Sequence, residues 1–238
     1  MSNTLAGKVA LVTGGTGGLG RSITLAFLHE GASVVATYIR EDEAASLRAA
    51  VGANQHLELL PLNATDETAT QALVDGITAR HGHLDFVVNT IGGYAGGKSL
   101  WETDTKSYHL MVDLNLNATY AVARAAAAAM IKQKSGSIVN IASRAALDHA
   151  AGNSAYSAAK AAALALIDCL AQELKGTGVR VNSILPSIID TEANRKSMPG
   201  SDFAKWPKPE DIAKVILFLC GTDAVLIHGA NIPVYGQT

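Results

Sequence analysis

The chain has 238 residues, of which 48% are hydrophobic and 17% charged, a composition that excludes a largely disordered protein. The formal net charge of −2 at pH 7 gives no indication of the broad basic surface that binds nucleic acid. The apolar runs are shorter than a membrane span, and residues 1–8 lack the apolar core of a signal peptide. Cys169 and Cys220 form no metal or disulfide framework, so we expect a cytoplasmic protein without a metal or a membrane partner.

Apolar runs and turn residues divide the chain into alternating strands and helices. The predicted strands are 9–12, 33–38, 57–60, 84–89, 137–142, 179–185 and 231–234. The predicted helices are 21–28, 42–50, 66–80 with Thr65 as its N-cap, 104–133, 154–175 and 209–220. Strands separated by helices predict an α/β fold with a doubly wound parallel sheet, and we expect one domain over residues 1–238.

The segment 190–207 has no regular period and contains Pro199, Gly200 and Pro207. It follows the C-terminal end of a predicted strand, which is where ligands bind in sheets of this kind. We therefore expect residues 190–207 to form a mobile lid over a substrate.

A glycine-rich turn at 13–20 joins the first predicted strand to the first predicted helix. Two registers fit it: G-x-G-x-x-G at Gly15, Gly17 and Gly20, and T-G-x-x-x-G-x-G at Gly14, Gly18 and Gly20. Glycines let the backbone approach a diphosphate, and a helix N-terminus offers free N–H groups to phosphate. A flexible turn without a ligand is the alternative, but the strand–turn–helix context favours nucleotide binding.

Four polar residues are candidates for catalysis. Tyr156 and Lys160 are four positions apart on a predicted helix and share a face, so the ammonium is expected to lower the pKa of the phenol. Ser143 follows the fifth predicted strand, and Asn115 lies inside a long helix in which asparagine is a poor helix former. The structural alternatives are separate surroundings for the tyrosine and lysine, an N-cap for the serine and a solvent-facing position for the asparagine.

Taken together, these residues resemble the short-chain dehydrogenase/reductase family over nearly the whole chain. Tyr156 to Lys160 matches the family's Y-x-x-x-K motif, and Ser143 precedes the tyrosine at the family's usual spacing. The glycine turn matches in the register Gly14, Gly18 and Gly20. The segments 89–92, 186–191 and 229–234 are also similar to family segments, with departures at Thr90, Ile91 and Ser187.

The resemblance implies a Rossmann fold, a nicotinamide cofactor and a division of roles. Tyr156 exchanges a proton with the substrate oxygen, and Ser143 hydrogen-bonds that oxygen. Lys160 binds the nicotinamide ribose, and Asn115 holds a water in the proton relay. The residues implied to bind the cofactor are Gly14, Thr16, Gly18, Leu19, Gly20, Tyr38, Arg40, Asn63, Ala64, Asn89, Gly92, Tyr156, Lys160, Ile189 and Thr191.

Cofactor preference depends on the end of the second predicted strand. An acidic residue there would bind the ribose 2′-hydroxyl of NAD, but Tyr38 holds the position, and Glu41 and Asp42 come too late in the sequence. Arg40 could pair with a 2′-phosphate, and no carboxylate is expected to repel one. We therefore expect NADP(H) to be favoured over NAD(H); a solvated Arg40 and no preference are the alternative.

The loop 92–97 and the segment 190–199 also resemble the dihydropteridine reductases of the same superfamily. Those enzymes lack the serine that Ser143 supplies here, and they favour NADH. On this resemblance and on position, the candidate substrate contacts are Tyr94, Trp101, His149, Asn194 and Trp206, each with packing or surface exposure as the alternative.

The leading hypothesis is an NAD(P)-dependent oxidoreductase that reduces a ketone or other carbonyl compound with NADPH, or oxidises the alcohol in reverse. The alternatives are a dihydropteridine or quinonoid reductase, a 3-oxoacyl thioester reductase, a nucleotide-binding sensor without turnover, and another Rossmann enzyme such as a methyltransferase. The complete set of four catalytic candidates argues against the sensor. The resemblance also implies a homotetramer or homodimer packed through the two long helices.

Overall fold

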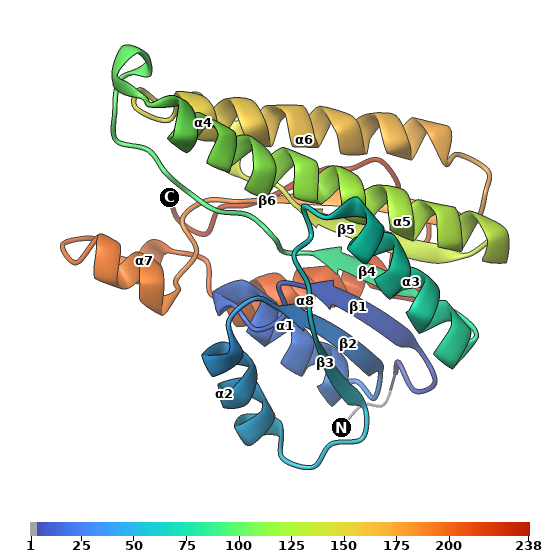
Figure 1. Cartoon of the computed structure of the whole chain (residues 1–238). Helices are drawn as coiled ribbons and strands as arrows, with labels where there is room; N and C mark the ends of the chain where they lie inside the picture. Colours follow the sequence, from blue (N-terminus) through green and yellow to red (C-terminus); the bar gives the residue numbers. More distant parts are fainter. Residues whose placement is uncertain (1–3) are drawn as a thin grey trace.

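Seven parallel strands form one sheet in the computed structural model, which describes residues 4–238. The strands are β1 (Val9–Thr13), β2 (Ser33–Tyr38), β3 (Leu57–Pro61), β4 (Phe86–Asn89), β5 (Gly136–Ile141), β6 (Val179–Pro186) and β7 (Asn231–Val234). Their spatial order is β3-β2-β1-β4-β5-β6-β7 (Figure 1). The chain adds strands toward one edge of the sheet from β1 to β3 and then toward the other edge from β4 to β7. The predicted doubly wound parallel sheet of the Rossmann type is therefore confirmed.

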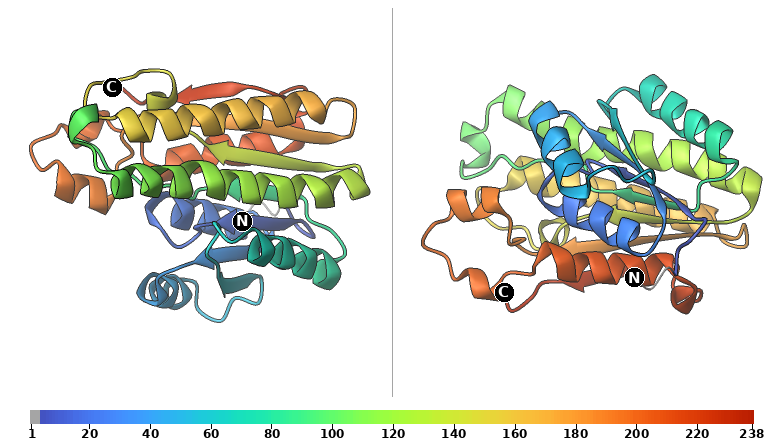
Figure 2. Two further views of the ribbon diagram at one scale, coloured as in Figure 1. Left: turned by 45° about the horizontal axis from the view of Figure 1, so that its top comes forward. Right: turned by 90° about the horizontal axis from the view of Figure 1, so that it is seen from below.

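Helices cover both faces of this sheet (Figures 1 and 2). They are α1 (Gly18–His29), α2 (Glu41–Val51), α3 (Glu67–His81), α4 (Thr105–Val112), α5 (Ala118–Gln133), α6 (Ser154–Glu173), α7 (Glu192–Ser197) and α8 (Pro209–Cys220). α1 and α8 pack on one face around the buried Phe27, whereas α3, α5 and α6 pack on the other around the buried Val74 and Ala126. Within the described residues, α6 alone has the length and hydropathy of a membrane span, a property that core helices of soluble proteins share.

Two predicted helix starts are corrected by the structure. The N-cap of α3 is Asp66 rather than Thr65, because the Asp66 carboxylate accepts a hydrogen bond from the Ala69 N–H at 2.9 Å. The first helix begins at Gly18 rather than at Arg21, so the glycine turn itself supplies the first N–H groups of α1.

The predicted helix over 104–133 changes its winding in the middle. Asp104 caps α4, which ends at Val112, and a π-helical segment, η2 (Asp113–Asn117), joins it to α5. A π segment adds a residue to the turn and re-aims the side chains within it. Asn115 lies in this segment and is fully buried, so the alternative of a solvent-facing asparagine is wrong.

A buried polar network ties the central strands together where they end. The sheet register pairs Thr13 with Asn89 and Asn89 with Asn140. The Asn89 Oδ1 atom accepts from the Thr13 hydroxyl at 2.8 Å, and its Nδ2 atom donates to Asn140 Oδ1 at 3.2 Å and to Thr119 Oγ1 at 3.1 Å. The Asn89 amide is therefore engaged inside the protein, and its contact with a cofactor stays a prediction.

Replacing Asn89 with alanine is expected to lower the free energy of unfolding by about 2 kcal/mol, because its buried partners lose their hydrogen bonds. Urea titration measures the change. The matched control is Asn117→Ala, which removes a solvent-exposed hydrogen bond to Asp113. This variant is expected to lower the free energy of unfolding by less than about 0.5 kcal/mol. Equally small effects in the two variants would contradict a structural role for the network.

Candidate active site

The glycine turn is closed to side chains at four positions: Gly15, where a Cβ atom would lie 2.6 Å from Ala36 Cβ, and the three glycines of one of the two registers. A Cβ atom on Gly14, where φ is +68°, would lie 2.9 Å from Thr90 Oγ1; on Gly18 it would lie 2.8 Å from Thr191 Cγ2; and on Gly20 it would overlap the Gly14 carbonyl oxygen. At Gly17 the nearest atom is 3.6 Å away, an ordinary contact. All three glycines of the T-G-x-x-x-G-x-G register are thus sterically required, whereas the middle glycine of the other register is not.

A cleft of about 300 Å³ lies between the glycine turn and the ends of β2 and β4. The predicted cofactor contacts in its wall are Gly14, Thr16, Gly18, Leu19, Gly20, Tyr38, Arg40 and Gly92. The backbone of the turn and the N-terminus of α1 offer N–H groups there, and the close approach that the glycines allow fits a diphosphate. The residues present therefore fit a dinucleotide.

The end of β2 is more acidic than the sequence spacing predicts. Thr16 Oγ1 donates to Glu43 Oε2 at 3.2 Å, and Glu43 forms part of the cleft wall. The Arg40 guanidinium makes a bidentate pair with Asp42, at 3.1 and 2.5 Å, and its Nε atom lies 3.6 Å from Glu43 Oε1. The expectation that no carboxylate would face a 2′-phosphate is therefore wrong, because one turn of α2 brings Glu43 back beside the glycine turn.

The hydroxyls of Ser143 and Tyr156 meet at the C-terminal edge of the sheet. Ser143 follows β5 in an extended conformation and caps the short 3-10 helix Arg144–Ala146, accepting from the Ala145 N–H at 3.1 Å. Tyr156 lies in the first turn of α6. Burial raises the pKa of the Tyr156 phenol above its ordinary value, and a hydrogen bond with Ser143 offsets part of that shift.

Lys160 lies one turn further along α6 and is buried. Its ammonium donates to the Ile141 carbonyl at 3.0 Å, and desolvation lowers the pKa of Lys160 to about 8. The expected lowering of the Tyr156 pKa by Lys160 is not what the structure shows, since burial dominates and raises it. The lysine instead converges with Asn115 on Gly92, where a Cβ atom would lie 3.1 Å from Lys160 Nζ and 2.9 Å from Asn115 Oδ1.

Asn115 holds the loop that follows β4. Its Nδ2 atom donates to the carbonyl oxygens of Gly93 and Met111, each at 3.0 Å, and its Oδ1 atom accepts from the Gly93 N–H at 3.2 Å. Residues 92–97, which we call the strap, are thereby fixed beside Lys160. That Asn115 also holds a water for proton relay stays a prediction.

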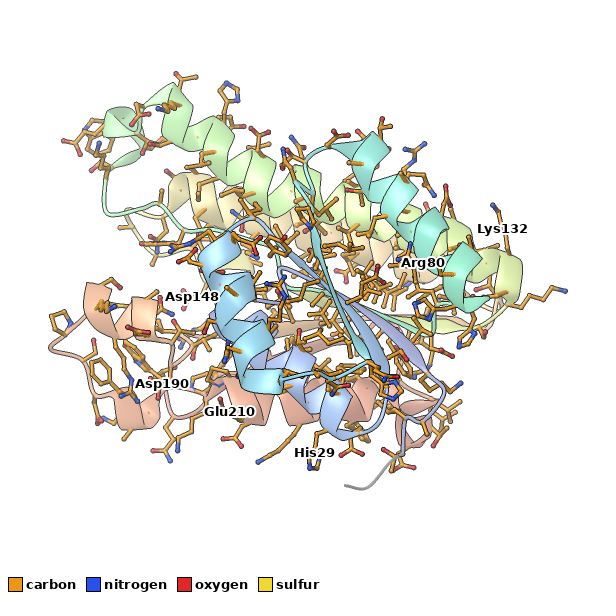
Figure 3. All side chains as sticks on the ribbon, turned by 60° about the horizontal axis from the view of Figure 1, so that its bottom comes forward. His29, Arg80, Lys132, Asp148, Asp190 and Glu210 are labelled. Carbon is orange, nitrogen blue, oxygen red and sulfur yellow. The ribbon has the colours of Figure 1, made fainter. Side chains whose placement is uncertain are left out.

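The predicted lid residues bind one another. Asp190 N–H donates to the Pro207 carbonyl at 3.0 Å and closes the two ends of the segment 190–207. Asn194 Nδ2 donates to the Ile189 carbonyl at 2.8 Å, and Trp206 is buried with its ring centroid 5.0 Å from that of Phe203. A second cavity of about 490 Å³ lies between the start of this segment, α1 and the start of α8. Asp190, on the segment, and Glu210, on α8, both line it and are labelled in Figure 3.

The remaining predicted contacts are not part of the cleft wall, although Thr191 lies next to it. His149 is exposed, and Trp101 is 86% exposed. The amide oxygen of Asn63, a predicted cofactor contact, accepts from the Thr65 hydroxyl at 2.9 Å. Ala64 is buried in the core, and Thr191 caps α7 while touching Gly18. Their contacts with cofactor or substrate stay predictions.

Comparison with known proteins identifies close similarity over the whole chain. The family model described as short chain dehydrogenase matches residues 8–202. A 3-oxoacyl-[acyl-carrier-protein] reductase of Thermotoga maritima is 31% identical over 241 residues, covering 98% of each chain. A short-chain type dehydrogenase/reductase from Mycobacterium ulcerans superposes with a TM-score of 0.93 at 31% identity, covering 98% of this chain and 90% of that one. The structure of ElxO with NADP bound gives a TM-score of 0.90 at 27% identity, covering 96% and 97%.

Lys160 is expected to make stability depend on pH. Its pKa is about 8 in the folded chain against an ordinary 10.5, so within this window the unfolded chain binds more protons and stability rises with pH. Relative to Lys160→Met, the wild-type free energy of unfolding should rise by up to about 3 kcal/mol across the window.

Urea titrations at several pH values measure this difference. Lys132→Met, at the exposed end of α5, is the matched control, and its difference from wild type should stay flat (Figure 3). A flat difference for Lys160→Met as well would show that the buried amine is not desolvated as described.

Proposed function

This chain belongs to the short-chain dehydrogenase family and is an oxidoreductase, and we propose that it reduces a ketone or related carbonyl compound with NADPH. The observation that carries the proposal is the meeting of the Ser143 and Tyr156 hydroxyls beside the buried Lys160, at the sheet edge that also holds the dinucleotide-shaped cleft. Two neighbouring hydroxyls that can both donate suit a carbonyl oxygen that gains negative charge during reduction.

The chain's own residues handle the oxygen and its proton. Ser143 hydrogen-bonds the carbonyl oxygen, and Tyr156 donates its phenolic proton to that oxygen as negative charge develops. With its pKa raised above the ordinary value, the phenol is protonated at neutral pH, which is the form that a proton donor needs. Gly92, Lys160 and the glycine turn would hold the nicotinamide cofactor, which supplies the hydride when bound.

The preference for NADPH rests on Arg40, whose guanidinium can pair with a 2′-phosphate at the wall of the cleft. The similarity to a structure that holds NADP supports this choice. Glu43 opposes it, because its carboxylate faces the same end of the cleft and already engages Arg40. NADH is therefore also expected to bind.

A 3-oxoacyl thioester is the second candidate substrate, favoured by the full-length similarity to a 3-oxoacyl-[acyl-carrier-protein] reductase.

We also propose a homodimer or homotetramer in the cytoplasm. The exposed rings of Tyr108 on α4 and Tyr120 on α5 support such contacts, because they leave apolar surface on the outer face of these helices.

Replacing Tyr156 with phenylalanine should lower kcat by about a thousandfold and leave NADPH binding nearly unchanged, because the variant loses only the proton donor. Steady-state assays with a panel of carbonyl compounds give kcat, and quenching or enhancement of nicotinamide fluorescence gives Kd. Tyr120→Phe, on the exposed side of α5, is the control and should keep full activity. Retained turnover in the Tyr156 variant would refute the assignment.

Arg40→Ala is expected to weaken NADPH binding about tenfold and NADH binding by less than twofold, because only NADPH carries the 2′-phosphate. Glu43→Gln should act in the opposite direction and strengthen NADPH binding roughly fivefold, since it removes a competing carboxylate. Glu58→Gln makes the same charge change on β3, where the carboxylate pairs with Arg80 away from the cleft wall, and should alter neither Kd. Equal effects on both cofactors would show that these residues do not read the 2′-phosphate.

A further inference from the structure

The strap is fixed from two directions. On the inner side, Asn115 binds the main chain of Gly93 through two hydrogen bonds, and the Ala95 N–H points at Met111 Sδ, 3.2 Å away. Its inner attachments therefore come from the helical stretch of α4 and η2. This anchoring makes the strap a rigid support rather than a free loop.

On the outer side, the strap joins the loop that leads into α6. The Gly97 N–H donates to the Gly152 carbonyl at 2.9 Å, and the Tyr94 hydroxyl donates to Asn153 Oδ1 at 2.7 Å. A Cβ atom on Gly96 would lie 2.5 Å from Tyr94 Oη and 2.7 Å from Asn153 Oδ1, so the glycine leaves room for this bond. Contacts between the strap and the loop before α6 therefore fix the position of the Tyr94 side chain.

The Tyr94 ring stands beside the phenol that the proposed reaction uses. The centroids of the Tyr94 and Tyr156 rings are 5.1 Å apart and their planes meet at 83°, an edge-to-face contact. Tyr94 nevertheless remains 64% exposed. A large aromatic ring that is held in one pose and left open beside a catalytic hydroxyl is typical of a ligand-contacting wall.

We propose that Tyr94 is a specificity-determining residue and that the substrate carries a flat aromatic ring on or next to its carbonyl group. The inference rests on the proposed carbonyl reduction. A carbonyl oxygen bound between the Ser143 and Tyr156 hydroxyls places its substituents close to the Tyr94 ring. An aromatic substituent gains about 0.5–1.5 kcal/mol from such a ring beyond the burial of its area, which a saturated ring of the same size does not.

The test compares acetophenone with cyclohexyl methyl ketone, which differ in the aromaticity of one six-membered ring. The measured quantity is the ratio of their kcat/KM values with NADPH. Tyr94→Leu should lower the aromatic-to-saturated ratio about fivefold, mainly through KM, and Tyr94→Phe should keep most of it because the ring remains. Phe218→Leu, which removes an exposed ring from α8, should leave the ratio unchanged.

A second variant keeps the test decisive if Tyr94→Leu fails to fold. Asn153→Ala releases the Tyr94 hydroxyl and should lower the same ratio by about twofold, while NADPH binding and the melting temperature stay near wild type. An equal loss for both ketones would overturn the inference and leave Tyr94 with a positioning role only. An unchanged ratio would overturn it too.

Failure of the proposed function would differ from failure of this inference. If the function is wrong, wild type and variants alike will neither bind NADPH nor reduce either ketone. If wild type binds NADPH and acetophenone neither reacts nor competes with a substrate that does, the cofactor assignment stands and the aromatic specificity is refuted.

Discussion

The two hydrogen bonds between the Asn115 amide and the main chain of Gly93 are the contact on which the rest of the site depends. They require a side chain directed inward from the middle of a 29-residue helical stretch, and the π turn of η2 directs it so. The same amide oxygen lies close to where a Gly92 side chain would stand, as does the Lys160 ammonium. The strap, the lysine and the helix are thus fixed by one buried asparagine.

The hydrogen-bond network around Asn89 fixes the chain just before the strap, as Asn115 fixes the strap itself. It joins β1, β4, β5 and α5 at the level where the strands end, immediately before the chain enters the strap. Because buried amides must be satisfied, both asparagines strongly constrain the local chain path. The buried amides of Asn89 and Asn115 therefore fix the chain around the cleft. The apolar clusters on the two faces of the sheet supply most of the folding free energy.

Much of this arrangement could be predicted from the sequence, because apolar runs and glycine patterns report local geometry. The seven strands, the glycine turn and the shared face of Tyr156 and Lys160 are all of this kind. Three features depend on contacts between distant segments and could not be predicted: the π turn at Asn115, the pairing of Tyr94 with Asn153, and the direction of the Tyr156 pKa shift. Glu43 was missed as well: its i+3 spacing from Arg40 could have indicated the ion pair, but no local pattern indicates its contact with Thr16.

The two ends of the site differ in how they treat charge. At the end of β2, Arg40 sits with Asp42 and Glu43 in solvent, so its charge is more than balanced and is screened. At the other end, beside α6, Lys160 is buried and Tyr156 is half-buried, and desolvation favours the neutral form of each. The phenol therefore keeps its proton, and the amine, with a pKa of about 8, remains mostly charged at neutral pH and donates to the Ile141 carbonyl. A protonated phenol beside a cation is the arrangement that stabilises negative charge developing on a nearby oxygen, and this is the charge change that the proposed carbonyl reduction requires.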